Sequence, residues 1–142
     1  MKRLILLIIG IIFSSFLFCQ TPEGKLKISH LTGDYYIFTT YKSLNGTIFP
    51  ANGMYVVTEN GIVLIDTPWD TTQFQPFCDS ILKRHNKKVI LCLATHFHDD
   101  RTGGFDFFKG IGAKTYSSKQ TFDLCKASLP KTFPYSNTSK HY

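Results

Sequence analysis

Two histidines and two aspartates lie within five consecutive residues, and this segment is the part of the chain best suited to bind a metal ion. His96 and His98 are two positions apart, so in an extended segment both imidazoles project to the same side. Asp100 lies two positions further on and can offer a carboxylate oxygen nearby. Nitrogen and carboxylate ligands suit zinc. The spacing therefore predicts a metal site at His96, His98 and Asp100, and the alternative is a solvated loop with no ligand role.

The residues on either side of this cluster indicate how it would be positioned. Residues 89–94 are apolar throughout, which predicts a strand buried on both faces. Ligands usually bind at the carboxyl ends of strands in sheets covered by helices, and the cluster follows this strand directly. Gly103-Gly104 then opens a short helix that runs through Phe108.

The N-terminal part of the chain reads as strands and hairpins. Residues 25–40 have a strand-like pattern with a turn at Gly33-Asp34. Residues 54–58 and 62–66 predict a hairpin, because Asn60-Gly61 between them is a strong hairpin signal. Residues 42–53 are either a second hairpin or a loop.

One helix is predicted after these strands, because its apolar residues recur at helical spacing. Asp70 with Gln73 resembles a capping box, Pro76 fits the first turn of a helix that begins near Gln75, and Asn86 ends the helix. The apolar face consists of Phe74, Phe77, Cys78, Ile81 and Leu82.

The whole pattern predicts the α/β fold class, with a mixed sheet and helices packed on it. Residues 113–117 predict another strand and residues 119–126 another helix, after which the tail is irregular. Residues 20–142 are interpreted as one domain. Three cysteines lie in it, and this odd number argues against a complete disulfide framework. Cys92, inside the apolar strand, is interpreted as a small buried residue.

Residues 1–19 have the pattern of a secretory signal peptide. Lys2 and Arg3 precede an apolar run over residues 4–18, which is shorter than the about 20 residues that span a bilayer. We expect cleavage after Cys19 and a periplasmic protein without stable membrane insertion; lipidation of Cys19 is the alternative. Loss of the two basic residues lowers the net charge from +6 to about +4. No basic run suited to phosphates is present, so no nucleic-acid partner is expected.

The segment Thr95-His96-Phe97-His98-Asp99-Asp100-Arg101-Thr102-Gly103-Gly104 resembles the zinc-binding loop of class B metallo-β-lactamases, His-x-His-x-Asp-Arg. Three further segments follow the order and spacing of that family: Asn52-Gly53-Met54-Tyr55, Val63-Leu64-Ile65-Asp66-Thr67-Pro68-Trp69 and Lys114-Thr115-Tyr116. The likeness covers most of the chain after the signal and is strongest to the chromosomal enzymes of flavobacteria.

This resemblance implies the αββα sandwich of the family, of which the chain would supply the N-terminal half. It also implies zinc-dependent hydrolysis of the β-lactam ring of penicillins, cephalosporins and carbapenems by the full-length parent, which confers antibiotic resistance. The partner would be the antibiotic, the protein a monomer, and the cofactor two zinc ions per full-length enzyme.

The resemblance assigns roles to six residues. It implies that His96 and His98 bind the first zinc, and that Asp100 binds the second and is catalytic because it helps to position the nucleophile. Arg101 would steady the ligand loop and Asp66 would be a buried carboxylate near it, although Asp66 could equally cap a turn. Phe49, in the flap formed by residues 42–53, would contact the antibiotic or simply pack. The other family ligands have no counterpart here, and Cys125 and His141 are left out of the ligand set.

Two alternatives remain open. Thioesterases, lactonases and related hydrolases of the same fold typically have His directly after the ligand Asp, where this chain has Arg101, and that residue favours a lactamase. The 142-residue chain could also be a non-catalytic fragment, since two or three ligands cannot close a site that needs three per metal. We therefore expect weak zinc binding and no turnover from this chain alone, and an exposed apolar sheet face.

Overall fold

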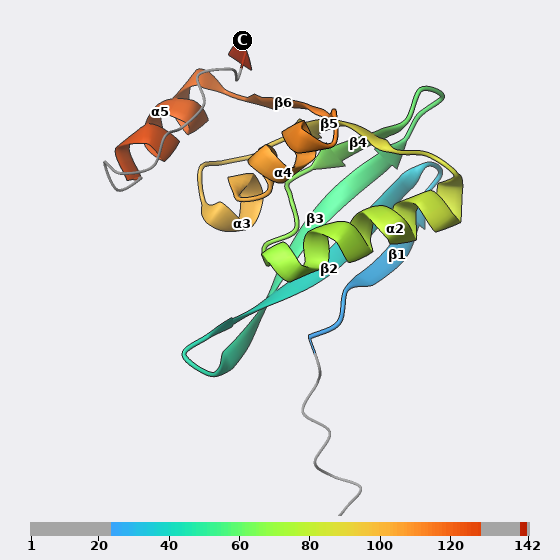
Figure 1. Ribbon diagram of the computed structural model, residues 1–142, viewed down its shortest axis with the longest axis horizontal. Helices are drawn as coiled ribbons and strands as arrows, with labels where there is room; N and C mark the ends of the chain where they lie inside the picture. The colour runs from blue at the N-terminus through green and yellow to red at the C-terminus, as the bar shows by residue number, and fades with distance from the viewer. Residues whose placement is uncertain (1–23, 129–139, 142) are drawn as a thin grey trace, which may run out of the picture.

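A computed structural model describes residues 24–128 and 140–141 of the chain, so the predicted signal peptide lies outside the described residues. Seven strands form one sheet, in which the spatial order β1 to β7 is also the order along the chain (Figure 1). β1 to β4 are antiparallel, and β4 to β7 run parallel. The predicted mixed sheet is therefore confirmed. The strands are β1 (Lys27–Thr32), β2 (Tyr35–Leu44), β3 (Thr47–Val57), β4 (Ile62–Ile65), β5 (Val89–Leu93), β6 (Lys114–Ser117) and β7 (Lys140–His141).

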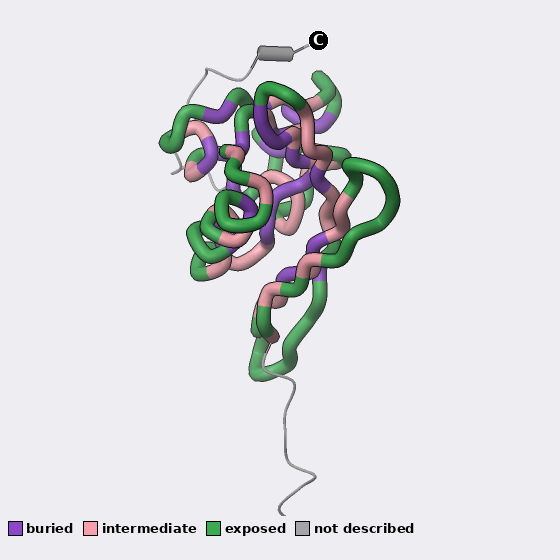
Figure 2. The backbone as a smooth tube through the Cα atoms, turned by 90° about the vertical axis from the view of Figure 1, so that its right-hand side faces the viewer, coloured by how far each residue is buried: buried purple, intermediate pink, exposed green. Residues whose placement is uncertain are grey.

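The segment left open as a hairpin or a loop is a hairpin. β2 and β3 pair without interruption from Tyr35↔Val56 to Leu44↔Thr47. Their turn consists of Asn45 and Gly46, both with positive φ (50° and 80°), a conformation that these two residue types tolerate best. The outer end of this hairpin is exposed on both strands (Figure 2).

Helix α2 (Phe74–His85) has Pro76 in its first turn, as predicted. It ends at Asn86, whose left-handed backbone (φ 52°) lets its N–H donate to the carbonyl of Leu82. The predicted capping box is wrong. Asp70 caps a short 3₁₀ helix, η2 (Thr71–Gln73), and the side chain of Gln73 bonds to the backbone of Tyr41 instead of reaching back.

Helices α2 and α4 (Phe105–Gly110) cover the same face of the sheet and enclose the core (Figure 1). The rings of Phe38 on β2 and Phe77 on α2 lie 4.6 Å apart between centroids. Two other helices, α3 (Asp99–Thr102) and α5 (Lys119–Ser128), complete the described part. The buried core consists of Phe38, Tyr55, Ile62, Leu64, Phe77, Ile81, Val89, Cys92, Phe105, Phe108 and Ala113. In the described residues, no helix is both long and apolar enough to cross a membrane.

Gly53 leaves the space that the ring of Phe38 fills. A Cβ at position 53 would lie 2.1 Å from Cζ of Phe38, and that ring is held by Phe77 beneath it. We expect Gly53→Ala to lower the free energy of unfolding by about 1–3 kcal/mol, because the core ring must leave its rotamer. Urea unfolding followed by circular dichroism measures this. Gly110→Ala, where no atom lies within 4 Å of the new Cβ, is the control, and equal losses in the two variants would refute the explanation.

His85, the last residue of α2, contacts the hydroxyl of Tyr55, with 3.0 Å between Nε2 and Oη. Burial raises the pKa of Tyr55 to about 12, so this hydroxyl stays protonated. Burial of the imidazole, with a smaller effect of Arg84, lowers the pKa of His85 below its ordinary value. The neutral ring is therefore the form that the folded chain favours.

This lowered pKa makes stability depend on pH in one direction. Below about pH 6.5 the unfolded chain binds a proton at His85 more readily than the folded chain does, so stability present above that pH is lost as pH falls. We expect the urea midpoint of the wild type to drop more between about pH 7 and about pH 5 than that of His85→Gln. Parallel pH profiles would show that His85 does not contribute.

The sequence predicts that β5 is buried on both faces, and this prediction is wrong. The register with β4 slips between Val89 and Leu91, so Ile90 is an extra residue and is 37% exposed. Cys92 faces the core and is fully buried, as expected. The opposite face of the sheet carries a cross-strand row of half-buried residues that no described helix covers: Ile37, Met54, Ile65, Leu93 and Tyr116.

The C-terminal region differs from the predictions in two places. α3 precedes the helix expected after Gly103-Gly104, because the chain already turns helical at Asp99. The tail was expected to be irregular, but the backbone of Lys140 and His141 pairs with β6, since a sheet edge offers unpaired backbone groups. The side chain of His141 lies outside what the structure describes.

Candidate metal site

The candidate site lies at the edge of the sheet where β4 and β5 end. The two strands are parallel, so their carboxyl ends meet, and Asp66 after β4 lies beside Thr95 after β5. The chain then passes through His96 and His98 and enters α3, with His98 at the N-cap. This arrangement places the end of a strand and the start of a helix around one point.

His96, His98 and Asp100 meet at that point. Their nearest ligand atoms all lie within 4.8 Å of one another, and the two imidazole centroids are 4.9 Å apart. Ligand atoms in a tetrahedral zinc site are roughly 3.3 Å apart, so modest side-chain rotations would suffice to close on an ion. The donor set of two nitrogens and one carboxylate fits a divalent transition metal. The structure thus brings the three predicted ligands together, and their role as ligands stays a prediction.

Thr95 orients the first of these imidazoles. Its Oγ1 lies 3.1 Å from Nδ1 of His96, a contact that leaves Nε2 for another partner. The same hydroxyl donates to Asp66 at 2.9 Å, and the backbone N–H of Thr95 donates to Oδ1 of Asp66 at 2.8 Å. Asp66 is 5% exposed and has a left-handed backbone (φ 63°). The buried carboxylate of Asp66 therefore holds Thr95 in place, and Thr95 in turn orients His96.

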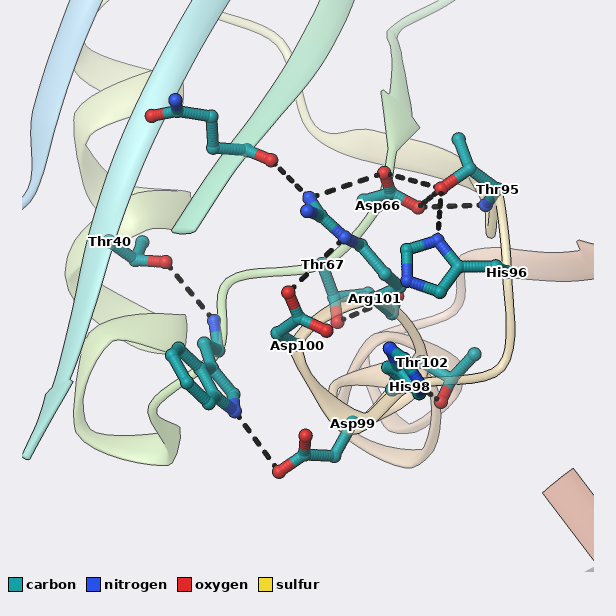
Figure 3. Close-up of polar contacts among 12 residues, drawn as sticks. Thr40, Asp66, Thr67, Thr95, His96, His98, Asp99, Asp100, Arg101 and Thr102 are labelled. Carbon is teal, nitrogen blue, oxygen red and sulfur yellow. Dashed lines mark hydrogen bonds and ion pairs between the residues drawn. The ribbon is translucent and has the colours of Figure 1, made fainter. Parts of the chain in front are cut away.

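Arg101 lies between the two carboxylates of the site (Figure 3). Its Nη1 is 3.5 Å from Oδ2 of Asp66, and its Nε is 3.3 Å from Oδ2 of Asp100. Nη1 also donates to the carbonyl of Asn52 on β3. Nε is buried and makes no hydrogen bond with the described residues, so its attraction to Asp100 is that of an ion pair. Arg101 thus contacts Asp66, Asp100 and the backbone of β3, and its role in steadying the ligand loop stays a prediction.

Thr67 joins β4 to the far side of the ligand loop. Its N–H and its hydroxyl both donate to the carbonyl of Arg101, at 3.0 and 3.1 Å, and the hydroxyl accepts from the N–H of Gly104. A Cβ on Gly104 would lie 2.8 Å from Cβ of Thr67, so a glycine is needed for this approach. Neither Thr95 nor Thr67 is predicted as a site residue from the sequence, although Thr95 precedes His96 and Thr67 follows Asp66.

Asp99 points away from the metal cluster toward the β2–β3 hairpin. Oδ2 of Asp99 accepts from Nζ of Lys42 at 2.9 Å and from Nε1 of Trp69 at 3.0 Å. Burial opposes ionisation of Asp99, but the bonds from Trp69 and Lys42 outweigh it and lower the pKa of this carboxyl. Asp99 therefore contacts the hairpin while its two chain neighbours belong to the metal cluster.

Two other residues considered from the sequence are Phe49 and Cys125. Phe49 is on the outer part of β3 and is 44% exposed, so its contact with an antibiotic stays a prediction. Cys125 is buried on α5, with Sγ 3.5 Å from the carbonyl of Phe97. Burial raises the pKa of this thiol, which disfavours the thiolate, the form that binds metals.

Comparison with known proteins identifies relatives of one kind, although no protein-family model matches the chain. The chain is 50% identical over 113 residues to a metallo-β-lactamase type 2 of Elizabethkingia meningoseptica, which covers 79% of this chain and 45% of that protein. It is 37% identical over 125 residues to metallo-β-lactamase IND-1 of Chryseobacterium indologenes, covering 88% and 52%.

Solved structures give the same result for the fold. The crystal structure of metallo-β-lactamase IND-7 matches with a TM-score of 0.69 and 35% identity, over 82% of this chain and 56% of that one. A metallo-β-lactamase from Pontibacter korlensis matches with a TM-score of 0.67 and 31% identity, over 73% and 48%. This chain spans about half the length of the curated relatives it matches, and over that span it is similar to metallo-β-lactamases in both sequence and fold.

Proposed function

We propose that the whole protein to which this chain belongs hydrolyses the β-lactam ring of antibiotics with zinc as its cofactor. The observation that carries the proposal is the convergence of His96, His98 and Asp100 within 4.8 Å at the mouth of the sheet. Its relatives are named metallo-β-lactamases, and Arg101 stands where related hydrolases of other substrates typically have His.

His96 and His98 would hold one zinc ion and Asp100 would contribute to a second. A bound zinc ion supplies a Lewis acid and lowers the pKa of water to about 7. Thr95 keeps Nδ1 of His96 occupied, so the ring presents Nε2. Arg101 attracts Oδ2 of Asp100, which would keep this carboxylate directed at the centre and leave Oδ1 for an ion or a water molecule.

We also propose where this enzyme acts, on which substrates, and in which oligomeric state. The pattern of residues 1–19 supports export to the periplasm followed by loss of the signal peptide. The substrates would be penicillins, cephalosporins and carbapenems, and the enzyme would act as a monomer. Within the described residues, a single group of three potential ligands is present, which supports weak zinc binding and no turnover by the 142-residue chain alone.

The test uses two proteins: the 142-residue chain and a full-length version that carries it. Both are purified without chelators, analysed for zinc, and assayed with a chromogenic cephalosporin, a carbapenem, a lactone and a thioester. We expect the full-length protein to contain zinc and to hydrolyse the two β-lactams, with activity lost on chelation and restored by zinc. Preference for the lactone or the thioester would favour the other hydrolases. A metal-free protein that is indifferent to added zinc would refute the proposal.

A further inference from the structure

The stem of the β2–β3 hairpin is tied to the rest of the molecule at successive residues. The N–H of Trp69 donates to Oγ1 of Thr40 at 3.2 Å. Gln73 holds the backbone of Tyr41 with both atoms of its amide, at 3.2 and 2.6 Å. The next residue, Lys42, bonds to Asp99. Lys42 is therefore the outermost of these ties, and residues 43–48 beyond it are all exposed.

The tie at Lys42 has three components, two of which meet at one carboxylate oxygen. Nζ of Lys42 and Nε1 of Trp69 both donate to Oδ2 of Asp99. The ammonium of Lys42 also lies 5.2 Å from the centroid of the Trp69 ring, a cation–π contact. A lysine fully exposed to solvent would make neither contact. Lys42 lies on β2, Trp69 in the segment after β4, and Asp99 on α3, so the tie joins three parts of the chain.

Both ends of this tie adjoin residues with predicted roles in the site. Asp99 lies between His98 and Asp100 in the sequence, so it shares a backbone with two of the three candidate ligands. On the hairpin, Lys42 pairs in register with Phe49, the residue expected to contact the antibiotic. The tie therefore connects the hairpin residue that pairs with Phe49 to the residue that lies between two candidate ligands.

We propose that Lys42 is a positioning residue, which holds the β2–β3 hairpin over the metal site through Asp99 and Trp69. The inference rests on the proposed function for its catalytic consequence. The side chains of Lys42 and Asp99 are 31% and 65% exposed. Such exposed pairs are weak and salt-sensitive, and they shift an equilibrium by about five-fold at most. The tie is thus strong enough to favour one hairpin position and weak enough to open when a substrate enters.

Trp69 is the sole tryptophan of the sequence, so its fluorescence reports on the tie without any need for activity. We expect Lys42→Met in the 142-residue chain to raise the acrylamide quenching of Trp69, and Lys42→Arg to restore it because the charge and the donor remain. About 1 M NaCl should raise quenching in the wild type and have little effect on Lys42→Met, because salt screens an exposed pair. Lys119→Met is the matched control, since it breaks an exposed Lys–Asp pair of the same kind (2.6 Å) on α5.

The same substitutions in the full-length protein test the role in the reaction. We expect Lys42→Met to raise KM for a β-lactam by about five-fold with little change in kcat, because the hairpin contributes to binding. Zinc content should stay at the wild-type level, which a general loss of structure would not allow. If the enzyme is active and Lys42→Met matches Lys119→Met in both quenching and KM, the inference is wrong. If no variant is active, the proposed function fails, and the quenching result still decides whether the tie exists.

Discussion

Asp100→Ala in the full-length protein is expected to lower kcat/KM for a carbapenem by about 10²- to 10⁴-fold, since a metal ligand supplies several kcal/mol of transition-state stabilisation. The substitution removes one of the three converging ligand atoms and also the partner that lies 3.3 Å from Nε of Arg101. Zinc content measured on the same preparations should fall by up to one ion per molecule, which separates loss of metal from loss of fold.

The control for this prediction is Asp79→Ala. Asp79 is an exposed carboxylate on α2 that, among the residues the structure describes, accepts a hydrogen bond from Gln75 of its own helix at 2.8 Å. Its removal should leave turnover and zinc content unchanged. Near-normal carbapenem hydrolysis by Asp100→Ala would contradict the role given to Asp100.

Asp66→Ala is expected to destabilise the chain by about 3–5 kcal/mol, the loss typical of removing one partner from a buried charged network. The substitution leaves the N–H and hydroxyl of Thr95 without their acceptor and Arg101 without one of its carboxylates. It also places Ala at φ 63°, a conformation that Asp and Asn tolerate better. Urea unfolding of the 142-residue chain, followed by circular dichroism, gives the loss directly.

Asp66→Asn is the informative companion, because it keeps the size of the side chain, one acceptor oxygen and the tolerance of positive φ. We expect it to recover much of the stability lost in Asp66→Ala but to weaken zinc binding, since Arg101 and the ligand loop lose a charge. A loss below about 1 kcal/mol for Asp66→Ala would show that the site does not depend on this carboxylate.

The elements that could be predicted from the sequence are those whose side chains carry a periodic signal. The apolar spacing from Phe74 to Leu82 and the Asn at position 86 identified α2 and its end. For the outer half of the β2–β3 hairpin, the sequence does not decide between a hairpin and a loop, because these residues are exposed on both faces and carry no alternating pattern. In this outer half the two strands are held together by their backbone pairing, which does not depend on a particular pattern of side chains.

The candidate ligands of the site could be predicted from the sequence, but the distant residues that orient them could not. The three candidate ligands lie within five residues, so local spacing was enough to bring them together. The residues that orient them come from far along the chain: Asp66 is 29 residues from Thr95, and Lys42 is 57 residues from Asp99. Contacts of this kind depend on which strands become neighbours, and the sequence indicates that only through the fold.

The order of the strands has a consequence for how the chain acquires its structure. Each strand pairs with the strand that precedes it, so the sheet can grow by addition at one edge while the polypeptide is still emerging. The early antiparallel pairings close over short loops, which favours rapid formation. The first parallel pairing then sets β5 beside β4 and brings Thr95 to Asp66, so the metal loop takes its shape only after the antiparallel strands have assembled.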